Sequence, residues 1–412
     1  LTTTHADTLY APDFNGVYQA FPADAPVWAG GRCELVGGPG TDVVKVFAND
    51  GPGGAPLPEM PYLQYYPGST NSAFYSNTLD ATAWTHTVGV DWAVDAVGLD
   101  GTPNSAVTVG DSSGSTVHRI YATTSSSAAK VSDTAQHTMV LWLKKDADET
   151  VFPRIIMGLL GGTPQNQAFT INKNTGVVAP LSGTGTTEVV DAGGWWKILV
   201  EMTSVAGNTN GNLDISPAYS STNGGSQDNT LQGSVVVGQV EFYYNKTIAE
   251  VRGLGPVFTT SAAVSVATTR YSFDLANHDD TNGSVYLEAT FNGNNNTEQT
   301  TTNLYSAQNN SGFGIIYKNS QSCSSYDGTT LATTVNLGAD ATGGKYACVY
   351  HAGEAQYMAR GNLVGGVGDI SSADTAYDGD FVVTAGALYL GNNARTYNAF
   401  SIRNLQRYDI TS

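Results

Sequence analysis

Residues 234–262 read SVVVGQVEFYYNKTIAEVRGLGPVFTTSA, and this stretch decides how the chain is divided. It begins as a β-strand, because residues 235–237 are all valine and residues 240–244 then alternate between apolar or aromatic and polar side chains. It ends at residues 253–256, GLGP, where glycine and proline break any regular element. A new alternating strand starts at Tyr271, so we expect this stretch to join two β-rich halves.

The composition favours many short strands joined by turns. A chain of 412 residues is too long for one ordinary core and suits two or three domains. Charged residues make up only 13%, and 47 glycines accompany abundant Thr, Ser and Asn, which occupy tight turns at little steric cost. The 22 Tyr, 13 Phe and 6 Trp argue for packed cores and against disorder.

The charge balance excludes two classes of partner. The formal net charge is −18 and the pI is about 4.5, with no cluster of Lys and Arg. Nucleic acids and anionic membranes both reward such clusters, so we expect neither as a partner. No run approaches the roughly 18 apolar residues of a membrane-spanning helix, so no membrane insertion is expected. No signal peptide is visible after Leu1, which leaves open whether residues precede it.

Proline distribution separates the first 70 residues from the rest. Residues 1–70 hold nine of the 15 prolines, and proline lacks the donor that a central strand needs. We therefore expect an irregular N-terminal arm that wraps, acting either as plain structure or as a segment that docks the chain on a partner. The remainder divides into residues 71–256 and residues 257–412.

Each of these two parts contains a series of strand-like segments without helices between them. In residues 138–143, Met139, Leu141 and Leu143 would face a core and Trp142 the opposite side. This pattern predicts an all-β protein with two antiparallel β-sandwich domains of jelly-roll type. The expected strands are 105–109, 116–121, 138–143, 152–159, 168–172, 195–202 and 235–244, then 284–291, 314–317, 345–350, 356–358, 387–390 and 400–408.

Signatures of catalysis are absent from the sequence. A glycan hydrolase needs two carboxylates across a cleft, but Glu241 and Glu288 are isolated in apolar strands, where an exposed strand face or a structural pair explains them. The six histidines show no HxH or HExxH spacing, and no GxSxG motif occurs. We therefore expect a protein without enzymatic activity.

Acidic turns and cysteines leave alternatives open. Asp274, Asn277 and residues 278–280 (HDD) could offer oxygen ligands to Ca²⁺, although Asp and Asn crowd ordinary turns; Asp374, Asp378 and Asp380 are judged the same way. We therefore expect no cofactor. Cys33 has no obvious partner, whereas Cys323 and Cys348 could pair across neighbouring strands or stay buried thiols.

Sugar recognition is the binding function that the composition favours. Glycan sites combine an aromatic face for the ring with Asn, Asp or Gln for the hydroxyls. C-terminal segments have this composition, although Tyr and Asn also decorate the edges of any large sandwich. The candidate carbohydrate-binding residues are Tyr305, Asn309, Tyr326, Tyr377, Asn392, Asn393 and Tyr397.

Several short motifs occur in order along almost the whole chain. They are DFNGV (13–17) with APV (25–27), YSN (75–77) with AWT (83–85), GQVE (238–241), FTTSAAV (258–264), GSVYLEA (283–289), LYLG (388–391) and IRNLQRY (402–408). Together they resemble the virion appendage proteins of tailed bacteriophages, the fibre, spike and decoration proteins with concanavalin A-like (laminin-G-like) lectin sandwiches. Residues 60–65 (MPYLQY) depart from the A-x-x-N-L-L segment usual in that family.

The resemblance implies a non-enzymatic virion structural protein of the tail-fibre, head-fibre or spike type. Its N-terminal arm would attach it to other virion proteins, and its outer sandwich would adhere to host-surface glycans. It would form a homo-oligomer, for which the resemblance alone suggests a trimer. Two alternatives remain, a capsid decoration protein without sugar binding and a glycan depolymerase. Lectin-like folds host many functions, so the fold alone does not choose among them.

Overall fold

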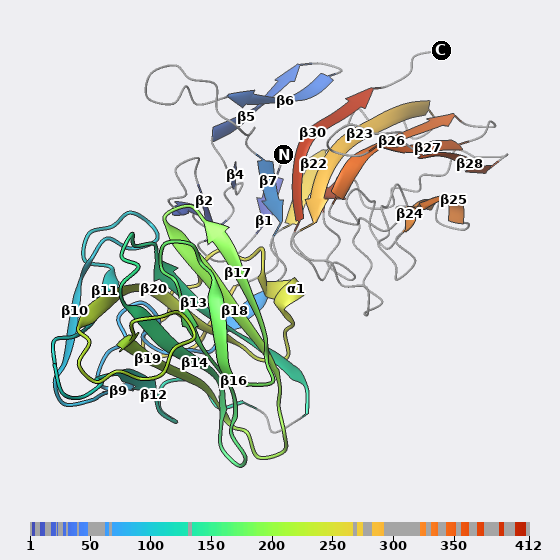
Figure 1. Ribbon diagram of the computed structural model, residues 1–412. Helices are drawn as coiled ribbons and strands as arrows, with labels where there is room; N and C mark the ends of the chain where they lie inside the picture. The colour runs from blue at the N-terminus through green and yellow to red at the C-terminus, as the bar shows by residue number, and fades with distance from the viewer. Residues whose placement is uncertain are drawn as a thin grey trace. The chain divides into compact units, whose positions relative to one another are not determined.

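Figure 1 shows the computed structural model of the protein, which is built almost entirely from β-strands. Outside a few N-terminal residues (9–11, 18–21 and 23), the structure describes the chain throughout at residues 68–130 and 134–266, and it describes the backbone of the remaining strands. The predicted all-β class is confirmed, since the four-residue α1 (Ile248–Val251) is the one α-helix among the described residues.

The chain forms two compact units, which are described separately below. We call the first the sandwich unit, formed by Asn15–Ala20 and Ser69–Val266. The second unit is formed by Leu1–Phe14, Phe21–Gly68 and Ala267–Ser412. These units do not follow the linear division at residues 70 and 256 that the sequence suggests.

The sandwich unit consists of two six-stranded antiparallel sheets. In the β20 sheet the order is β10 (Val90–Ala96), β11 (Ala106–Asp111), β20 (Gly233–Tyr243), β13 (Gln136–Lys144), β18 (Trp195–Thr203) and β17 (Thr186–Ala192). In the β19 sheet the order is β16 (Val178–Gly183), β15 (Gln165–Ile171), β14 (Phe152–Leu160), β19 (Asn210–Ser220), β12 (Ile120–Ala122) and β9 (Trp84–His86). The chain crosses between the sheets after β9, β11, β12, β13, β16, β18 and β19, which confirms the predicted sandwich.

The core lies between these two sheets and follows the period of two in the sequence. Met139, Leu141 and Leu143 of β13 are fully buried in it, as their spacing predicts. Trp142 points to the opposite face, also as predicted, yet it is fully buried as well. The other sheet supplies Ile155, Met157, Leu159, Leu213 and Ile215 to the same core.

A covering layer explains why the outward faces of β13, β18 and β20, the central strands of the β20 sheet, are buried. Residues 245–260, which include α1, lie over these strands, and Figure 1 shows α1 beside β18. Tyr18 meets the Trp142 ring edge-on, with ring centroids 5.2 Å apart. Gln239 and Glu241, which alternate with core residues of β20, are fully buried under this layer.

Lys197 of β18 fastens the covering layer to the sheet. Its buried ammonium donates hydrogen bonds to the carbonyl oxygens of Val251, Arg252 and Leu254 at 2.9, 2.9 and 2.7 Å. The last carbonyls of a helix have no partner within the helix, so Lys197 supplies the missing donors. Burial lowers the pKa of Lys197 to about 8, against the opposing effect of Glu241.

Glu241 holds the next part of the same layer. Its carboxylate accepts hydrogen bonds from the Val257 amide at 2.8 Å and from Trp142 Nε1 at 3.3 Å. Burial raises the pKa of Glu241 to about 7. Beyond it, β21 (Val264–Val266) pairs with β8 (Ser69–Asn71). The sandwich unit therefore ends at Val266, and a boundary at residue 256 would cut through its covering layer.

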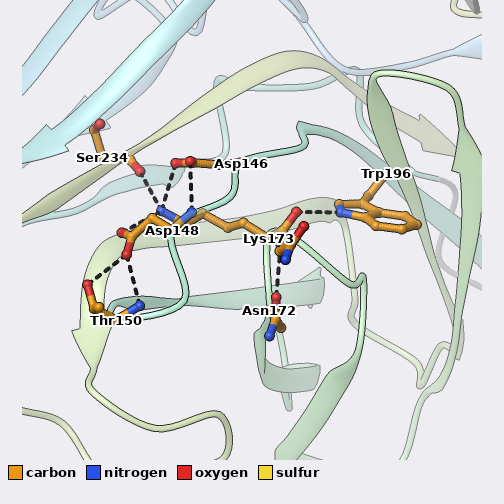
Figure 2. Close-up of polar contacts among 8 residues, drawn as sticks. Asp146, Asp148, Thr150, Asn172, Lys173, Trp196 and Ser234 are labelled. Carbon is orange, nitrogen blue, oxygen red and sulfur yellow. Dashed lines mark hydrogen bonds and ion pairs between the residues drawn. The ribbon is translucent and has the colours of Figure 1, made fainter.

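A second buried lysine closes one end of the sandwich, and Figure 2 shows its contacts. We call this group the Lys173 clasp. Lys173 Nζ lies 3.1 Å from Asp146 Oδ2, 3.3 Å from Asp148 Oδ2 and 3.4 Å from the Ser234 carbonyl oxygen. Its carbonyl accepts a 2.7 Å hydrogen bond from Trp196 Nε1. The clasp thereby ties the turn after β15 to the β13–β14 connection and to β20.

Each carboxylate of the clasp divides its two oxygens between loop and lysine. Asp146 Oδ1 accepts the Asp148 amide, and Asp148 Oδ1 accepts both the amide and the hydroxyl of Thr150. Burial opposes ionisation of Asp146, but the Asp148 amide and Lys173 outweigh it and lower the pKa of Asp146. The Thr150 hydroxyl and amide lower the pKa of Asp148. The loop of the clasp is thus held both by its own hydrogen bonds and by the ammonium of Lys173.

The second unit contains a seven-stranded antiparallel sheet and three smaller ladders. The large sheet has the order β28 (Asp369–Asp374), β27 (Gln356–Gly361), β26 (Gly343–His351), β23 (Asn282–Phe291), β30 (Phe400–Tyr408), β7 (Tyr62–Tyr65) and β4 (Trp28–Ala29). The ladders are β1 (Thr2–Thr4) with β22 (Arg270–Asp274) and β29 (Ala387–Leu390), β5 (Arg32–Gly38) with β6 (Thr41–Phe47), and β24 (Ser322–Tyr326) with β25 (Leu331–Asn336). A further short strand of this unit is β2 (Leu9–Pro12), whereas most of β3 (Tyr18–Phe21) belongs to the sandwich unit.

Residues 1–70 contribute strands to the second unit, which their proline content did not predict. Tyr65 pairs with Phe400, and Thr3 pairs with Tyr271. Proline removes a donor only at its own position, so proline-free runs such as β6 remain able to pair. Cys323 lies in β24 and Cys348 in β26, strands of different sheets, so the two cysteines are not on neighbouring strands.

Candidate functional site

The outward face of the β19 sheet carries the candidate site. On β19, Leu213 and Ile215 enter the core, so Asn212, Asp214 and Ser216 point the other way. Register places further side chains on the same face, because directly paired residues share a face. We define the polar face as Arg119, Tyr121, Arg154, Asn166, Asn212, Asp214, Ser216 and Tyr219.

Asp214 lies at the centre of the polar face between two arginines. Its Oδ2 is 2.5 Å from Arg119 Nη1, and its Oδ1 is 3.5 Å from Arg154 Nη2. Arg154 Nη2 also donates to Ser216 Oγ at 3.1 Å. The Asp214 side chain is only 8% exposed, whereas that of Arg119 is 42% exposed. The carboxylate is thus held beneath two guanidinium groups, one of which reaches solvent.

Two tyrosines complete the centre of the face. The Arg119 guanidinium carbon lies 4.9 Å from the Tyr121 ring centroid, and that of Arg154 lies 4.8 Å from the Tyr219 ring centroid. Such cation–π contacts are attractive and hold both guanidinium groups near aromatic rings. Tyr121 and Tyr219 are both half-buried, so each presents part of a ring at the surface.

Two hydrogen-bonded amide side chains lie beside Asp214 on the polar face, on the strands that flank Gly158. Asn212 Nδ2 donates to Asn166 Oδ1 at 2.7 Å, and both residues pair with Gly158 across the sheet. A Cβ on Gly158 would lie 2.0 Å from the Gln165 carbonyl oxygen and 2.8 Å from Asn166 Oδ1. Glycine is therefore required at this position, because the backbone of the neighbouring strand approaches too closely for any side chain.

Connections border the polar face at both ends of β19. Thr170 Oγ1 donates to Asn223 Oδ1 at 2.7 Å, which folds the connection after β19 over one end. At the other end, Asn210 Nδ2 donates to the Thr124 carbonyl oxygen at 3.2 Å. The described chain thus frames the face at its ends. Asn212, Asp214 and Ser216 are buried at its centre, and Arg119, which is 42% exposed, reaches the surface beside them.

This arrangement suits binding better than glycan hydrolysis. Ring faces, amides and a guanidinium are the groups that recognise sugar rings and hydroxyls. Hydrolysis by the usual mechanism would need a second carboxylate opposite the first. Asp214 is the one carboxylate of the polar face, and both of its neighbours are cations.

The sugar-binding residues expected from the sequence lie outside this face. Tyr326 is the last residue of β24, where only the backbone is described, and the other six lie outside the described residues. The expected carbohydrate site in the C-terminal segments therefore remains a prediction. The acidic turn that includes residues 278–280 is also outside the described residues. Within the described part of the chain, no group of three His, Cys, Asp or Glu side chains could hold a metal ion.

Sequence reasoning missed the polar face because it missed β19. Residues 210–216, NGNLDIS, alternate polar and small or apolar residues, which is a strand signal. Pro217 and two Asn residues weaken that signal, since both types are depleted in strands. Glu241 is placed in a structural role, where it binds the Val257 amide beneath the covering layer.

Comparisons with known proteins do not assign the chain to a family. No family profile matches, and no curated protein sequence matches. Among solved structures, the chain is similar to the N-terminal CBM22-1–CBM22-2 tandem domain of Xyn10C from Paenibacillus barcinonensis. The identity is 9%, the TM-score is 0.26, and the match covers 84% of this chain and 99% of that one. A likeness this low says nothing about ligand. No helix in the described part of the chain is both long and apolar enough to span a membrane.

Proposed function

We propose that this protein is a non-enzymatic adhesion protein that binds glycans through the polar face of the sandwich unit. The observation that carries the proposal is the contrast between the outward faces of the two sheets. The covering layer buries Trp142, Lys197 and Glu241 on the outward face of the β20 sheet. On the polar face, Arg119 is 42% exposed and Tyr121 and Tyr219 are half-buried, although Asp214 between the two arginines is buried.

The chemistry of the face fits a sugar in three respects. Tyr121 and Tyr219 offer ring surface for the apolar side of a pyranose. Asn166 and Asn212 offer amide groups to hydroxyls, and the arginines add donors in a fixed orientation. The side chains are held by their neighbours before any ligand arrives, which lowers the entropy lost on binding.

The sequence resemblance supplies the biological setting of the proposal. A tailed-phage appendage protein would display the sandwich unit at the virion surface, as an oligomer attached to other virion proteins, and would use the polar face to adhere to host glycans. Immunogold electron microscopy of purified particles, with an antibody against residues 263–412, tests this setting. Gold on particles supports it, and chain found only free in the lysate overturns it.

Calorimetric titration of the full chain with a panel of host-surface polysaccharides tests the binding. We expect saturable binding that weakens about tenfold in Asn212→Ala, since one hydrogen bond of about 1 kcal/mol is lost with its neighbour's alignment. Asn229→Ala, an exposed amide in the connection before β20, is the matched control and should bind like the unmodified chain. Absence of saturable binding would instead favour a decoration protein, and released reducing ends would favour a depolymerase.

A further inference from the structure

The two sheets of the sandwich unit differ in charge as well as in cover. The strands of the β20 sheet carry seven carboxylates against two lysines, Lys144 and Lys197. The strands of the β19 sheet carry one of each sign, Arg154 and Asp214. The seven carboxylates are Asp91, Asp95, Asp111, Glu188, Asp191, Glu201 and Glu241.

Arg119, which directly precedes β12, gives the polar face a net positive charge. Arg119 and Arg154 share the single carboxylate of Asp214, so the polar face holds two positive charges and one negative charge. The chain as a whole has a net charge of −18. A neutral ligand needs no such excess, whereas an anionic ligand would be repelled by most of this surface and attracted here.

Arg119 is the arginine able to meet that ligand. Its side chain is 42% exposed, against 18% for Arg154. One guanidinium nitrogen donates to Asp214, and the guanidinium carbon lies 4.9 Å from the Tyr121 ring centroid. These contacts hold the group and leave it further N–H donors. Two parallel N–H groups in a fixed plane match the oxygens of a carboxylate or a sulfate.

We propose that the ligand of the polar face is an acidic glycan, whose carboxylate or sulfate group pairs with Arg119 while its ring lies against Tyr121. This inference rests on the proposed glycan-binding function and names the class of sugar. Arg119 is then a specificity-determining residue, because it separates charged from neutral sugars of the same shape.

Calorimetric titration of the full chain with an oligogalacturonate and with its methyl ester tests the inference. The ester keeps the ring and removes the charge. We expect the acid to bind about tenfold or more tightly than the ester, because charge-assisted hydrogen bonds are stronger than neutral ones. Raising NaCl from 50 to 300 mM should weaken the acid alone, since salt screens an exposed ion pair. A sulfated polysaccharide in the same titration distinguishes sulfate from carboxylate.

Two variants separate a specific contact from overall charge. Arg119→Gln should bring the acid down to the affinity of the ester and abolish its salt dependence. Lys145→Gln makes the same charge change at the Asp191 ion pair beside β17 and should leave both affinities unchanged. Thermal unfolding of each variant checks that it is folded.

The outcomes distinguish this inference from the function on which it rests. Equal binding of acid and ester, or discrimination that survives in Arg119→Gln, overturns the acidic-glycan inference and leaves glycan binding standing. Failure of every acidic, sulfated and neutral glycan to bind overturns both.

Discussion

The outward faces of the two sheets differ in how their polar side chains find hydrogen-bond partners. On the β20 sheet, Lys197 and Glu241 point away from the core and are satisfied by backbone groups of residues 251–257. On the β19 sheet, Arg119 and Asp214 also point away from the core but bond each other through Asp214 Oδ2. One face is therefore closed by the chain, whereas on the other Asp214 Oδ1 and Arg154 Nε are buried without a hydrogen-bond partner in the described part of the chain.

The difference teaches how to interpret polar residues that alternate with core residues. Their presence alone does not indicate a binding face, since Gln239 and Glu241 alternate as regularly as Asn212 and Asp214. The deciding feature is the partner. Polar groups that bond a distant backbone segment hold a layer in place, whereas groups that bond laterally leave a surface for a ligand.

Removing the lysine beneath the covering layer should give the largest effect. Lys197→Met leaves the carbonyls of residues 251, 252 and 254 without their donor and Glu241 without its nearby cation. We expect the free energy of unfolding in urea to fall by about 3–5 kcal/mol, the usual cost of removing one partner of a buried charged group. Lys145→Met is the control, because its ion pair with Asp191 is exposed. A loss below about 1 kcal/mol in Lys197→Met would show that the covering layer stays in place without the Lys197 ammonium.

The pH dependence of stability tests the role of Glu241 beneath the covering layer. The pKa of Glu241 is about 7 in the folded chain, above the ordinary carboxyl value of 4.5. The folded state therefore binds more protons than the unfolded state between these values, so Glu241 makes stability rise as pH falls from about 7 towards 4.5. Urea unfolding at several pH values should show this slope in the unmodified chain and lose it in Glu241→Gln. An identical slope in both would contradict the assignment.

The Lys173 clasp should give an intermediate effect. The Lys173 side chain is 2% exposed, but those of Asp146 and Asp148 are 49% and 36% exposed and can be rehydrated. We expect Lys173→Met to cost about 1–3 kcal/mol in urea unfolding, between an exposed and a buried pair. Because the pKa values of both aspartates are lowered, their contribution is present above the ordinary carboxyl pKa and is lost as pH falls through the lowered values. A loss equal to that of Lys197→Met would show that exposure of the partners is irrelevant.

Changes on the polar face should have the smallest effect on stability and a clear effect on binding. Tyr121 is half-buried on the short strand β12, so Tyr121→Ala should change the free energy of unfolding by about 1 kcal/mol or less. Its affinity for the glycan should fall about tenfold, because the ring surface is lost. Calorimetric titration measures the second effect and urea unfolding the first. Unchanged affinity would remove Tyr121 from the site.

Sequence patterns captured the core far better than the site. The alternation of Met139, Leu141 and Leu143 is a local property, and the structure places these residues as predicted. The polar face draws on β12, β14, β15 and β19, and its centre joins Arg119 to Asp214, 95 positions apart. No local pattern contains that juxtaposition, because it follows from strand order in the folded sheet.

Three properties could be predicted from the sequence alone: an all-β chain with a sandwich core, a strongly acidic composition, and a break in regular structure at residues 253–256. They depend on composition and on a two-residue period, which act over a few neighbouring residues. That the broken segment covers one sheet, and that the other sheet carries a polar face, becomes visible only in the folded chain. The physical reason is that the role of a polar side chain on a strand depends on the group to which it hydrogen-bonds. The partners of Lys197, Glu241 and Asp214 are brought to them only when the chain folds.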